Sequence, residues 1–478
     1  MRPRRDVGRS RRGDGVLPAR PRRAGGLRPP PARRGLRGGG AGARHRRGAA
    51  GQARRSPARR ARRHGRQDVE LRAPFDVEAV RADFPILRQE IHGKPLVYLD
   101  NAASAQKPQA VLDRIMQAYS EDYANVHRGL HTLANRSTEA YEGARETVRR
   151  HINAASADEV IFTRSSTEAI NLVSNAWGRG HIGEGDEIVL SVMEHHSNIV
   201  PWHMLRTEKG AVLKWVELAE DGSLDMASFE SALSERTKLV AIVHMSNVLG
   251  TVTPVADIVE IAHARGIPVL VDGSQSTAHG PVDVQALDCD FFACTGHKIY
   301  GPTGIGVLYG KRAILEEMPP FLGGGEMIAA VGRDEIIYAG LPNRFEAGTP
   351  PIVQAIGLGA ALDYVAEIGW DRIHAHEMAV RDYARERLRG INALTLYGDA
   401  PGKGAVFAFN LEGAHPHDVA TILDREGVAV RAGTHCAEPL MDALGTTATC
   451  RASFGLYNTV AEVDRLAEAI EKAHRFFV

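Results

Sequence analysis

The sequence predicts an α/β protein whose main sheet is mostly parallel and covered by helices on both faces. From about residue 77 onward, short β-branched runs alternate with helix-length segments, which is the pattern of strand–helix–strand units. After about residue 351, long helices such as Ile356–Glu367 and Asp371–Leu388 alternate with short strands, which indicates a second, smaller α/β domain. The strand-like runs of the first part are Glu159–Phe162, Glu187–Leu190, Val212–Val216, Leu239–Val243, Val269–Val271, Phe291–Ala293 and Ile305–Tyr309.

The chain of 478 residues has an ordinary globular composition, with 44% hydrophobic and 24% charged residues. This composition excludes a collagenous, a wholly disordered or a disulfide-built protein. The net charge of +1 conceals two opposed parts. Residues 1–70 hold 23 arginines and four acidic residues, a net charge of +19, whereas residues 71–478 hold 36 basic and 54 acidic residues, a net charge of −18.

The basic segment at the start contains no Phe, Trp, Tyr or Ile, but it has 13 glycines and seven prolines. Such a segment buries too little apolar surface to offset the entropy of ordering it. We therefore expect residues 1–72 to be a disordered extension, which a start codon assigned too far upstream would explain. The alternatives are an arm for nucleic acid or a membrane surface, and a transit peptide. The segment lacks the aromatic, amphipathic and serine-rich patterns of these alternatives, so we expect neither a nucleic-acid nor a membrane partner.

Four cysteines, Cys289, Cys294, Cys436 and Cys450, are too few for a disulfide framework in a chain of this length. No Cys-x-x-Cys pair and no Cys/His cluster has the spacing of a zinc site, so the sequence predicts no metal. No apolar run approaches the roughly 18–20 residues that a membrane-spanning helix needs. These observations favour the cytoplasm as the compartment.

Polar motifs follow three of the predicted strands at the point where each strand ends. Residues 163–168 (TRSSTE) lead into a helix, and their hydroxyls and backbone N–H groups form an anion site. Residues 272–275 (DGSQ) and 295–298 (TGHK) follow two other strands. Taken singly, each motif is more typical of a helix cap or a solvated charge. Together, beyond the carboxyl ends of parallel strands, they provide the anion site, carboxylate and amine that pyridoxal phosphate requires.

From about Val77 to the C-terminus, the chain resembles the SufS-type, group II cysteine desulfurases of the class V aminotransferase family. The resemblance implies a fold-type I pyridoxal-phosphate enzyme, like aspartate aminotransferase, that forms a homodimer. It predicts an N-terminal segment over 73–97 that packs on the small domain, a large cofactor-binding domain over 98–350 and a small domain over 351–478. The matching segments are YLDNAASAQKP (98–108), NVHRGLHTL (125–133), TEAINLV (167–173), MEHHSNIVPW (193–202), SNVLGT (246–251), VDGSQ (271–275), TGHKIYGPTGIGVLYG (295–310), GGGEMI (323–328), FEAGTP (345–350), RAGTHCAEPLM (431–441) and CRASFGLYNT (450–459).

The resemblance also implies how pyridoxal 5′-phosphate is bound. Lys298 would hold the cofactor covalently, and Asp272 would pair with the pyridinium nitrogen. Gln275 would hydrogen-bond the phenolic oxygen, and His195 would stack on the ring and take part in proton transfer, whereas the adjacent His196 would be structural. The implied phosphate ligands are Thr167, Thr295, His297 and, from the other subunit of the dimer, Thr349.

A second reactive group is Cys436, which the resemblance implies to be the nucleophile. It lies in a polar loop with nearby cations, where a thiolate is favoured. Arg451 would clamp the substrate carboxylate in a bidentate manner. We expect Cys289 and Cys294 to be structural thiols and Cys450 to have a packing role. The other residues implied on the substrate side are His127, Asn247 and Arg431.

The function implied by the resemblance is the conversion of L-cysteine to L-alanine with a persulfide left on Cys436. The sulfur would pass to a carrier protein of the SufE or SufU kind for iron–sulfur cluster assembly. Selenocysteine lyase activity on the same scaffold, aminotransferase activity and nucleic-acid binding through the basic segment remain as alternatives. The sequence departs from the commonest family pattern at Thr434, where many relatives have His, at Ser274 and at Thr295. None of these departures removes a group that the chemistry needs.

Overall fold

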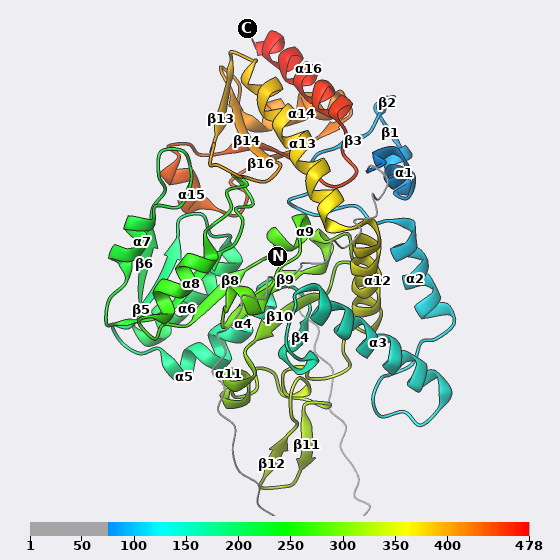
Figure 1. Cartoon of the computed structure of the whole chain (residues 1–478), viewed down its shortest axis with the longest axis vertical. Helices are drawn as coiled ribbons and strands as arrows, with labels where there is room; N and C mark the ends of the chain where they lie inside the picture. Colours follow the sequence, from blue (N-terminus) through cyan, green and yellow to red (C-terminus); the bar gives the residue numbers. More distant parts are fainter. Residues whose placement is uncertain (1–74, 478) are drawn as a thin grey trace, which may run out of the picture. The chain divides into compact units, whose positions relative to one another are not determined.

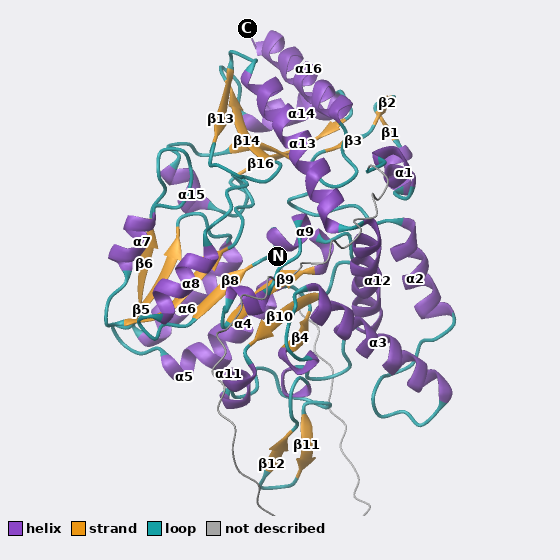
Figure 2. Cartoon of the chain, viewed as in Figure 1, coloured by secondary structure: helices purple, strands orange, loops and turns teal. Residues whose placement is uncertain are grey.

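The computed structural model describes residues 75–477, and the extension predicted over residues 1–72 lies outside the described residues. A seven-stranded sheet with the order β4-β10-β9-β8-β7-β5-β6 forms the centre of the described chain (Figure 1, Figure 2). Neighbouring strands from β9 through β8, β7 and β5 to β6 run parallel, which confirms the predicted mostly parallel sheet. The strands are β4 (Val160–Thr163), β5 (Glu187–Ser191), β6 (Val212–Val216), β7 (Thr237–Val243), β8 (Val269–Asp272), β9 (Phe291–Thr295) and β10 (Gly306–Gly310).

Strand β10 runs antiparallel to both of its neighbours, β9 and β4. The connection from β9 to β10 spans residues 296–305, and a parallel crossover needs a dozen or more residues. The chain therefore reverses instead of crossing over. The short turn that carries Lys298, Gly296–Lys298, lies directly after β9, at the carboxyl end of this strand.

Two hydrophobic clusters cover the two faces of this sheet, because successive side chains of a strand point to opposite faces. In β7, Val240 and Ile242 belong to one cluster, while Leu239 and Ala241 belong to the other. A strand that is buried on both faces has a continuous apolar sequence. The strands of this sheet therefore appear in the sequence as β-branched runs without alternation between apolar and polar residues. The helices that accompany this sheet are α2 (Gln109–Ser120), α3 (Thr132–His151), α4 (Ser166–Leu172), α5 (Arg179–His181), α6 (Val200–Lys209), α7 (Met226–Ala232), α8 (Val255–His263), α9 (Ser276–His279), α10 (Val284–Leu287), α11 (Arg312–Glu317) and α12 (Ile352–Ile368).

A second sheet of four antiparallel strands, in the order β13-β14-β17-β16, lies in the C-terminal part of the chain (Figure 2). Helix α16 packs on α13 and α14, and α13 and α14 pack on the strands of this sheet, around a separate hydrophobic cluster that includes Phe407, Phe409 and Leu466. The elements of this part are α13 (Trp370–Arg389), β13 (Leu394–Tyr397), β14 (Val406–Leu411), α14 (Pro416–Arg425), β15 (Val428–Ala429), β16 (Arg431–Gly433), α15 (Glu438–Ala443), β17 (Thr449–Ser453) and α16 (Val460–Phe477).

The segment that precedes the large sheet in sequence pairs with this C-terminal part. Strand β3 (Val97–Tyr98) lies parallel to β15, and Asp100 forms an isolated parallel bridge with Ser453. The remaining elements before β3 are α1 (Val77–Ala82), a short 3-10 helix (Pro85–Arg88), β1 (Glu90–Ile91) and β2 (Lys94–Pro95). The predicted domain boundaries at residues 97 and 350 stay a prediction. Helix α12, which follows the second boundary, packs on α2 and α3 beside the large sheet.

A hairpin of β11 (Ile328–Val331) and β12 (Ile336–Tyr338) extends from the large sheet region (Figure 1). Its side chains are mostly exposed, including the apolar Val331, Ile336, Ile337 and Tyr338. Within residues 75–477, no single helix is long and apolar enough to cross a membrane. The bent pair α12 and α13, at 79°, meets the length and composition test together, and α12 contributes ten buried residues to the interior.

Candidate active site

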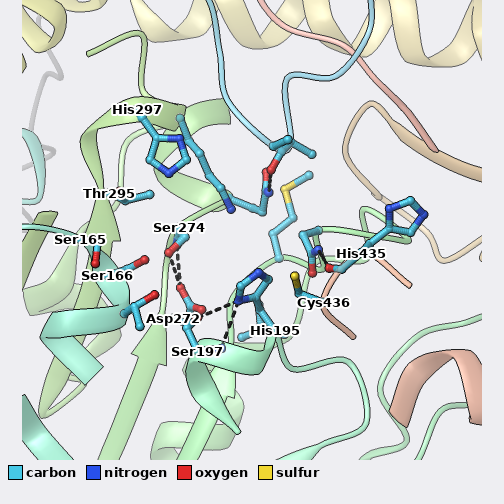
Figure 3. A pocket seen from close by; sticks show the side chains of 18 of the residues that line it. Ser165, Ser166, His195, Ser197, Asp272, Ser274, Thr295, His297, His435 and Cys436 are labelled. Carbon is cyan, nitrogen blue, oxygen red and sulfur yellow. Dashed lines mark hydrogen bonds between the residues drawn. The ribbon is translucent and has the colours of Figure 1, made fainter. Parts of the chain in front are cut away.

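A cavity of about 310 Å³ opens at the carboxyl ends of the large sheet's strands, which is where open α/β sheets bind their ligands (Figure 3). Segments from both sheets contribute to it. Its lining residues are Ala102, Ala103, Ser165, Ser166, Thr167, His195, Ser197, Val243, Met245, Asn247, Asp272, Ser274, Gln275, Thr295, His297, Lys298, Arg431, His435, Cys436 and Arg451.

The last residue of β8, Asp272, lines the cavity. A Cβ atom at the next residue, Gly273, would lie 1.9 Å from the Phe292 ring, so only glycine lets β8 pack this closely on β9. Asp272 Oδ1 accepts hydrogen bonds from the Ser274 amide at 3.0 Å and from the Ser274 hydroxyl at 2.6 Å. These two hydrogen bonds fix the orientation of the carboxylate.

Lys298 lies in the same cavity, in the turn after β9. Burial lowers the pKa of its amine to about 8, although the Asp272 carboxylate acts in the opposite direction. A substantial fraction of the free amine is therefore unprotonated near neutral pH. An unprotonated amine is a nucleophile and can accept a proton, which a surface lysine with its higher pKa rarely does.

His195 reaches the cavity from the loop after β5. Burial lowers the pKa of its imidazole to about 3, so the ring is neutral at physiological pH. Its Nδ1 accepts a hydrogen bond from the Ser197 amide at 3.1 Å and lies 2.8 Å from the Ser197 hydroxyl. Because Nδ1 is an acceptor, the neutral ring carries its proton on Nε2.

Glu194, which precedes His195 in the same loop, is fully buried. Its carboxyl oxygens accept hydrogen bonds from the Ser191 hydroxyl at 2.6 Å, the Val243 amide at 2.9 Å and the Asn198 side chain at 2.7 Å. Burial raises the pKa of Glu194 to about 8. The network fastens the loop that carries His195 to the end of β7.

The residues around the cavity match the groups of pyridoxal phosphate. Gln275 donates its amide to the Ala102 carbonyl at 2.7 Å, while its Oε1 is buried and has no partner in the described part of the chain. A buried unsatisfied polar atom at a cavity wall indicates a missing ligand group. The hydroxyl-rich turn before α4, with Thr295 and His297, adds donors for a phosphate. The donor set, the carboxylate and the amine therefore fit the cofactor.

Cys436 lines the cavity from the C-terminal side and is exposed. Both Cys436 and His435 have positive φ angles, 57° and 56°, which is unusual for residues other than glycine. Tethers hold this strained loop: the Asn247 amide donates to the His435 carbonyl at 2.9 Å, and the His196 amide donates to the Cys436 carbonyl at 2.8 Å. The His435 ring donates from Nε2 to the Thr449 carbonyl at 3.0 Å. Strain held by such contacts is typical of a functional position.

The other three cysteines, Cys289, Cys294 and Cys450, are buried. Burial raises the pKa of each of these thiols to about 12. Their thiolate forms are therefore negligible at neutral pH, and Cys436 is the thiol that is placed to react.

Two arginines of the C-terminal sheet, Arg431 and Arg451, line the cavity beside Cys436. Arg451 is almost fully buried, and its Nη1 donates to the Asn247 carbonyl at 3.1 Å. Both guanidinium groups also donate to the carboxylate of Asp100. The cavity therefore has a cationic side next to its exposed thiol.

Two predicted site residues, Thr349 and His127, lie outside this cavity. Thr349 lines a neighbouring cavity of about 350 Å³ together with residues such as Arg164. His127 Nε2 lies 2.8 Å from a Glu142 carboxylate oxygen, and a hydrogen bond with Glu142 raises its pKa. Their predicted roles, across a dimer and at the substrate, stay predictions. The other predicted residues, Thr167, His195, Asn247, Asp272, Gln275, Thr295, His297, Lys298, Arg431, Cys436 and Arg451, all line the one cavity.

Sequence reasoning assigned no role to four residues that shape the site: Asp100, Glu194, Ser197 and His435. The serine two positions after His195 was a usable signal, since a hydroxyl residue at that spacing commonly pairs with its neighbour's side chain and backbone. Asp100 and Glu194 carried no such signal, because their partners lie in distant segments.

The fold and the cavity together define a fold-type I pyridoxal-phosphate enzyme. A model of the aminotransferase class-V family matches residues 97–466. A probable cysteine desulfurase from Halalkalibacterium halodurans is 54% identical over 403 residues, which cover 84% of this chain and 99% of that protein. A cysteine desulfurase from Pectobacterium atrosepticum is 53% identical over 402 residues, 84% of this chain and 98% of that protein.

Solved structures give the same result. The crystal structure of the cysteine desulfurase CsdA from Escherichia coli superposes with a TM-score of 0.79 at 39% identity, covering 85% of this chain and all of that one. The apo structure of a cysteine desulfurase from Thermococcus onnurineus NA1 has a TM-score of 0.79 at 38% identity, covering 84% of this chain and 98% of that one. The chain belongs to the aminotransferase class-V family, and its cofactor is pyridoxal phosphate.

Proposed function

We propose that this protein is a cysteine desulfurase that converts L-cysteine to L-alanine and leaves the sulfur as a persulfide on Cys436. One observation carries the proposal: a half-buried amine, Lys298, and an exposed thiol, Cys436, line the same cavity although they come from distant parts of the chain. Cysteine desulfurases at 53–54% identity over almost their full lengths support the same reaction.

When bound, pyridoxal phosphate withdraws electrons from the α-carbon of the amino acid and so makes its α-proton acidic. In the proposal, Lys298 holds the cofactor, while Asp272 and Gln275 hold its ring nitrogen and its phenolic oxygen. Its phosphate is held by Thr167, Thr295, His297 and, from a second subunit, Thr349.

The proton transfers are assigned to Lys298, and the orientation of the substrate to His195. The Lys298 amine, with a pKa of about 8, takes the α-proton of the substrate. The neutral His195 ring presents Nε2–H to the cavity, because Ser197 occupies Nδ1. An N–H group in this position orients the bound substrate, and the protonated Lys298 amine returns a proton to the α-carbon.

Sulfur transfer is assigned to Cys436, whose thiolate attacks the sulfur atom of the substrate cysteine. A sulfur–sulfur bond forms and the carbon–sulfur bond of the substrate breaks. The electron pair of the broken bond stays with the β-carbon, which takes up a proton and becomes the methyl group of alanine. Lys298, Arg431 and Arg451 line the same cavity as this thiol.

The persulfide on Cys436 then needs an acceptor, for which we propose a protein of the SufE or SufU kind that serves iron–sulfur cluster assembly. The exposure of Cys436 supports transfer to another protein, because a macromolecular thiol must reach this sulfur. We propose a cytoplasmic location as well, which the four free thiols in the described part of the chain support.

A homodimer is the proposed assembly. It is supported by the apolar side chains of the β11–β12 hairpin, which lie exposed in the single chain. The position of Thr349 outside its own subunit's cofactor cavity also supports a role for this residue in a second subunit.

The test incubates the holoenzyme with L-cysteine and measures alanine together with Cys436-bound sulfur by mass spectrometry. Wild-type protein is expected to form alanine without any keto acid and to carry one added sulfur atom on Cys436. Cys436→Ala is expected to lower kcat/KM for L-cysteine by at least about a thousandfold, because it removes the nucleophile. The matched control, Cys450→Ala, removes a buried thiol and should stay within about threefold of wild type.

Three outcomes would contradict the desulfurase proposal. Alanine that forms only when a keto acid is added would establish an aminotransferase. A higher kcat/KM for selenocysteine than for cysteine in the wild type would establish a selenocysteine lyase. Full cysteine turnover in Cys436→Ala would remove the nucleophile from the mechanism.

A further inference from the structure

Three donors converge on the peptide bond that precedes Lys298. The carbonyl oxygen of His297 accepts hydrogen bonds from the Ala105 amide at 3.1 Å and from the Ser104 hydroxyl at 3.3 Å. The Lys107 ammonium group donates to the same oxygen at 3.1 Å. A carbonyl oxygen has two lone pairs, so three donors exceed its ordinary complement. The backbone next to Lys298 is therefore held from outside its own turn.

Lys107 differs from the other two donors because it carries a charge. Its side chain is half-buried, and burial lowers the pKa of its amine to about 8, so the amine is still mostly protonated at neutral pH. Its ammonium group also donates to the Ala105 carbonyl, and in the described part of the chain no carboxylate forms an ion pair with it. A buried charge is costly unless it is paired or hydrogen-bonded. The two carbonyl oxygens are therefore the groups that hold this charge inside the protein.

The segment that carries the three donors is itself anchored. Tyr98 Oη donates to the Ser104 carbonyl at 2.7 Å, and the Gln106 amide donates to Tyr457 Oη at 3.0 Å. Two residues after Lys107, the segment enters helix α2. The donors therefore belong to a fixed support rather than to a loose loop.

Lys107 does not line the cavity, whereas the side chains of His297 and Lys298 both do (Figure 3). The turn between them and β9 is short, since Gly296–Lys298 is a single 3-10 turn. A shift of the peptide bond that joins His297 to Lys298 therefore moves the base of the Lys298 side chain directly. Proton transfer depends steeply on the position of the base, and a displacement of about 1 Å can cost a hundredfold in rate.

We propose that Lys107 is a positioning residue: its ammonium group holds the peptide bond between His297 and Lys298 and thereby directs the Lys298 side chain into the cavity. This inference rests on the proposed function, in which Lys298 holds the cofactor and takes the α-proton. The groups assigned to the substrate's carboxylate and sulfur, Arg451 and Cys436, belong to other segments of the chain. Loss of the ammonium group should therefore slow the step that Lys298 performs and leave substrate binding unchanged.

A merely structural role for Lys107 makes a different prediction. If this lysine only stabilised the fold, its loss would lower the free energy of unfolding but leave kcat and KM of the folded protein unchanged. The chain offers a matched control in Lys403, which is also buried, with a pKa that burial lowers to about 8 and an Nζ that donates to the Gly398 carbonyl at 2.8 Å. Neither Lys403 nor Gly398 lines the cavity. Lys403→Met thus removes the same kind of group away from the site.

The experiment measures kcat and KM for L-cysteine with folded holoenzymes. Lys107→Met keeps the length of the side chain but removes its charge and donors, so kcat should fall about tenfold while KM stays within about twofold of wild type. Lys107→Arg keeps a cation and its donors and should recover most of kcat. Ser104→Ala removes a neutral donor from the same carbonyl, so kcat should fall only about threefold. Lys403→Met should stay within about twofold of wild type in both constants.

A second readout does not depend on turnover. Because Lys298 holds the cofactor, a displaced Lys298 side chain should retain it less well. Dialysis of the holoenzymes, followed by the absorbance of the bound cofactor, measures its rate of release. Release should be about fivefold faster in Lys107→Met than in wild type, and Lys403→Met should release the cofactor at the wild-type rate.

Three results would overturn the inference. One is a folded Lys107→Met protein with unchanged kcat and unchanged cofactor release; if this variant does not fold, an unchanged kcat in Ser104→Ala has the same meaning. The second is an equal fall of kcat in Lys403→Met. The third is a loss in Lys107→Arg as large as that in Lys107→Met, because the ammonium charge and donors would then not be the cause.

Cysteine turnover by the wild type, measured alongside, separates these failures from a failure of the proposed function. If the wild type produces alanine from cysteine and Lys107→Met behaves like it, the function stands and the role of Lys107 falls. If the wild type produces no alanine, the proposed function falls, and the rate of cofactor release still tests whether Lys107 positions Lys298.

Discussion

The two sides of the cavity differ in how their reactive groups are held. On the strand-end side, formed by the segments that follow the strands of the large sheet, Lys298 and His195 are partly buried, and burial lowers the pKa of both side chains. On the C-terminal side, formed by β16, β17 and the loop between them, Cys436 is exposed in a loop with two consecutive positive φ angles.

This difference reflects two kinds of task. Proton transfer on a bound amino acid needs groups whose protonation the protein controls, and exclusion of water provides that control. Sulfur delivery needs an atom that another macromolecule can reach, so the thiol must remain accessible. The chain meets both needs by building one cavity from two sheets with different exposure.

The largest expected contrast is between the alkylation rates of two cysteines, one from each side of the cavity. Cys436 should react with iodoacetamide at pH 8 at least about a thousandfold faster than Cys294, which lies on β9 next to Thr295 on the strand-end side. The pKa of Cys294 is about 12, so only about one molecule in ten thousand carries its thiolate at this pH. Peptide mass spectrometry of the folded protein measures both rates. Comparable labelling of Cys294 and Cys436 before denaturation would contradict the contrast.

A smaller effect is expected on the free energy of unfolding. It comes from Glu194, the buried residue that precedes His195 in the loop after β5. Burial raises its pKa to about 8 from the ordinary value of 4.5, so folding favours its protonated form. The contribution of protonated Glu194 to the free energy of unfolding is fully present below pH 4.5 and is lost as the pH rises through about 8. The free energy of unfolding should therefore fall by up to about 1.4 kcal/mol per pH unit between pH 5 and 8 through this group.

Urea unfolding of the holoenzyme at several pH values measures this slope, and Glu194→Gln should flatten it. Glu142 provides the control, because hydrogen bonds from His127 and Arg145, opposed by burial, lower its pKa to about 2. Its contribution is present above pH 4.5 and is lost as the pH falls toward 2, so Glu142→Gln should leave the slope between pH 5 and 8 unchanged. An equal slope in wild type and Glu194→Gln would show that Glu194 is ionised in the folded protein.

The smallest expected effect concerns the orientation of His195. Nitrogen-15 NMR of histidine-labelled protein should show a neutral ring with its proton on Nε2 from pH 5 to 8, because burial lowers its pKa to about 3. Ser197→Ala removes the hydroxyl near Nδ1 and keeps the backbone amide, so kcat/KM should fall by only about threefold. A His195 ring that titrates near pH 6.5 would show that water reaches this side chain and that burial does not lower its pKa.

Much of the fold was predictable, because both faces of the large sheet are buried and its strands form continuous apolar runs. The helix predicted at Asp371–Leu388 is α13, Trp370–Arg389, and the predicted strand Val212–Val216 is β6 with the same bounds. The direction of β10 was not predictable from its apolar pattern, since parallel and antiparallel strands with two buried faces read alike. It follows from the short connection after β9.

Within the site, the sequence by itself determined the groups at or just after the end of a strand, such as Asp272 and Lys298, because parallel strands carry their ends to one edge whatever the rest of the chain does. Tertiary structure alone decided the contacts between distant segments. Asp100 meets Arg431 and Arg451 only because its backbone bridges to β17, and Glu194 meets the Val243 amide only because β5 and β7 are neighbours. Exposure has the same origin: Cys436 and Cys450 are both thiols near cations, and packing decides that one is accessible and the other buried.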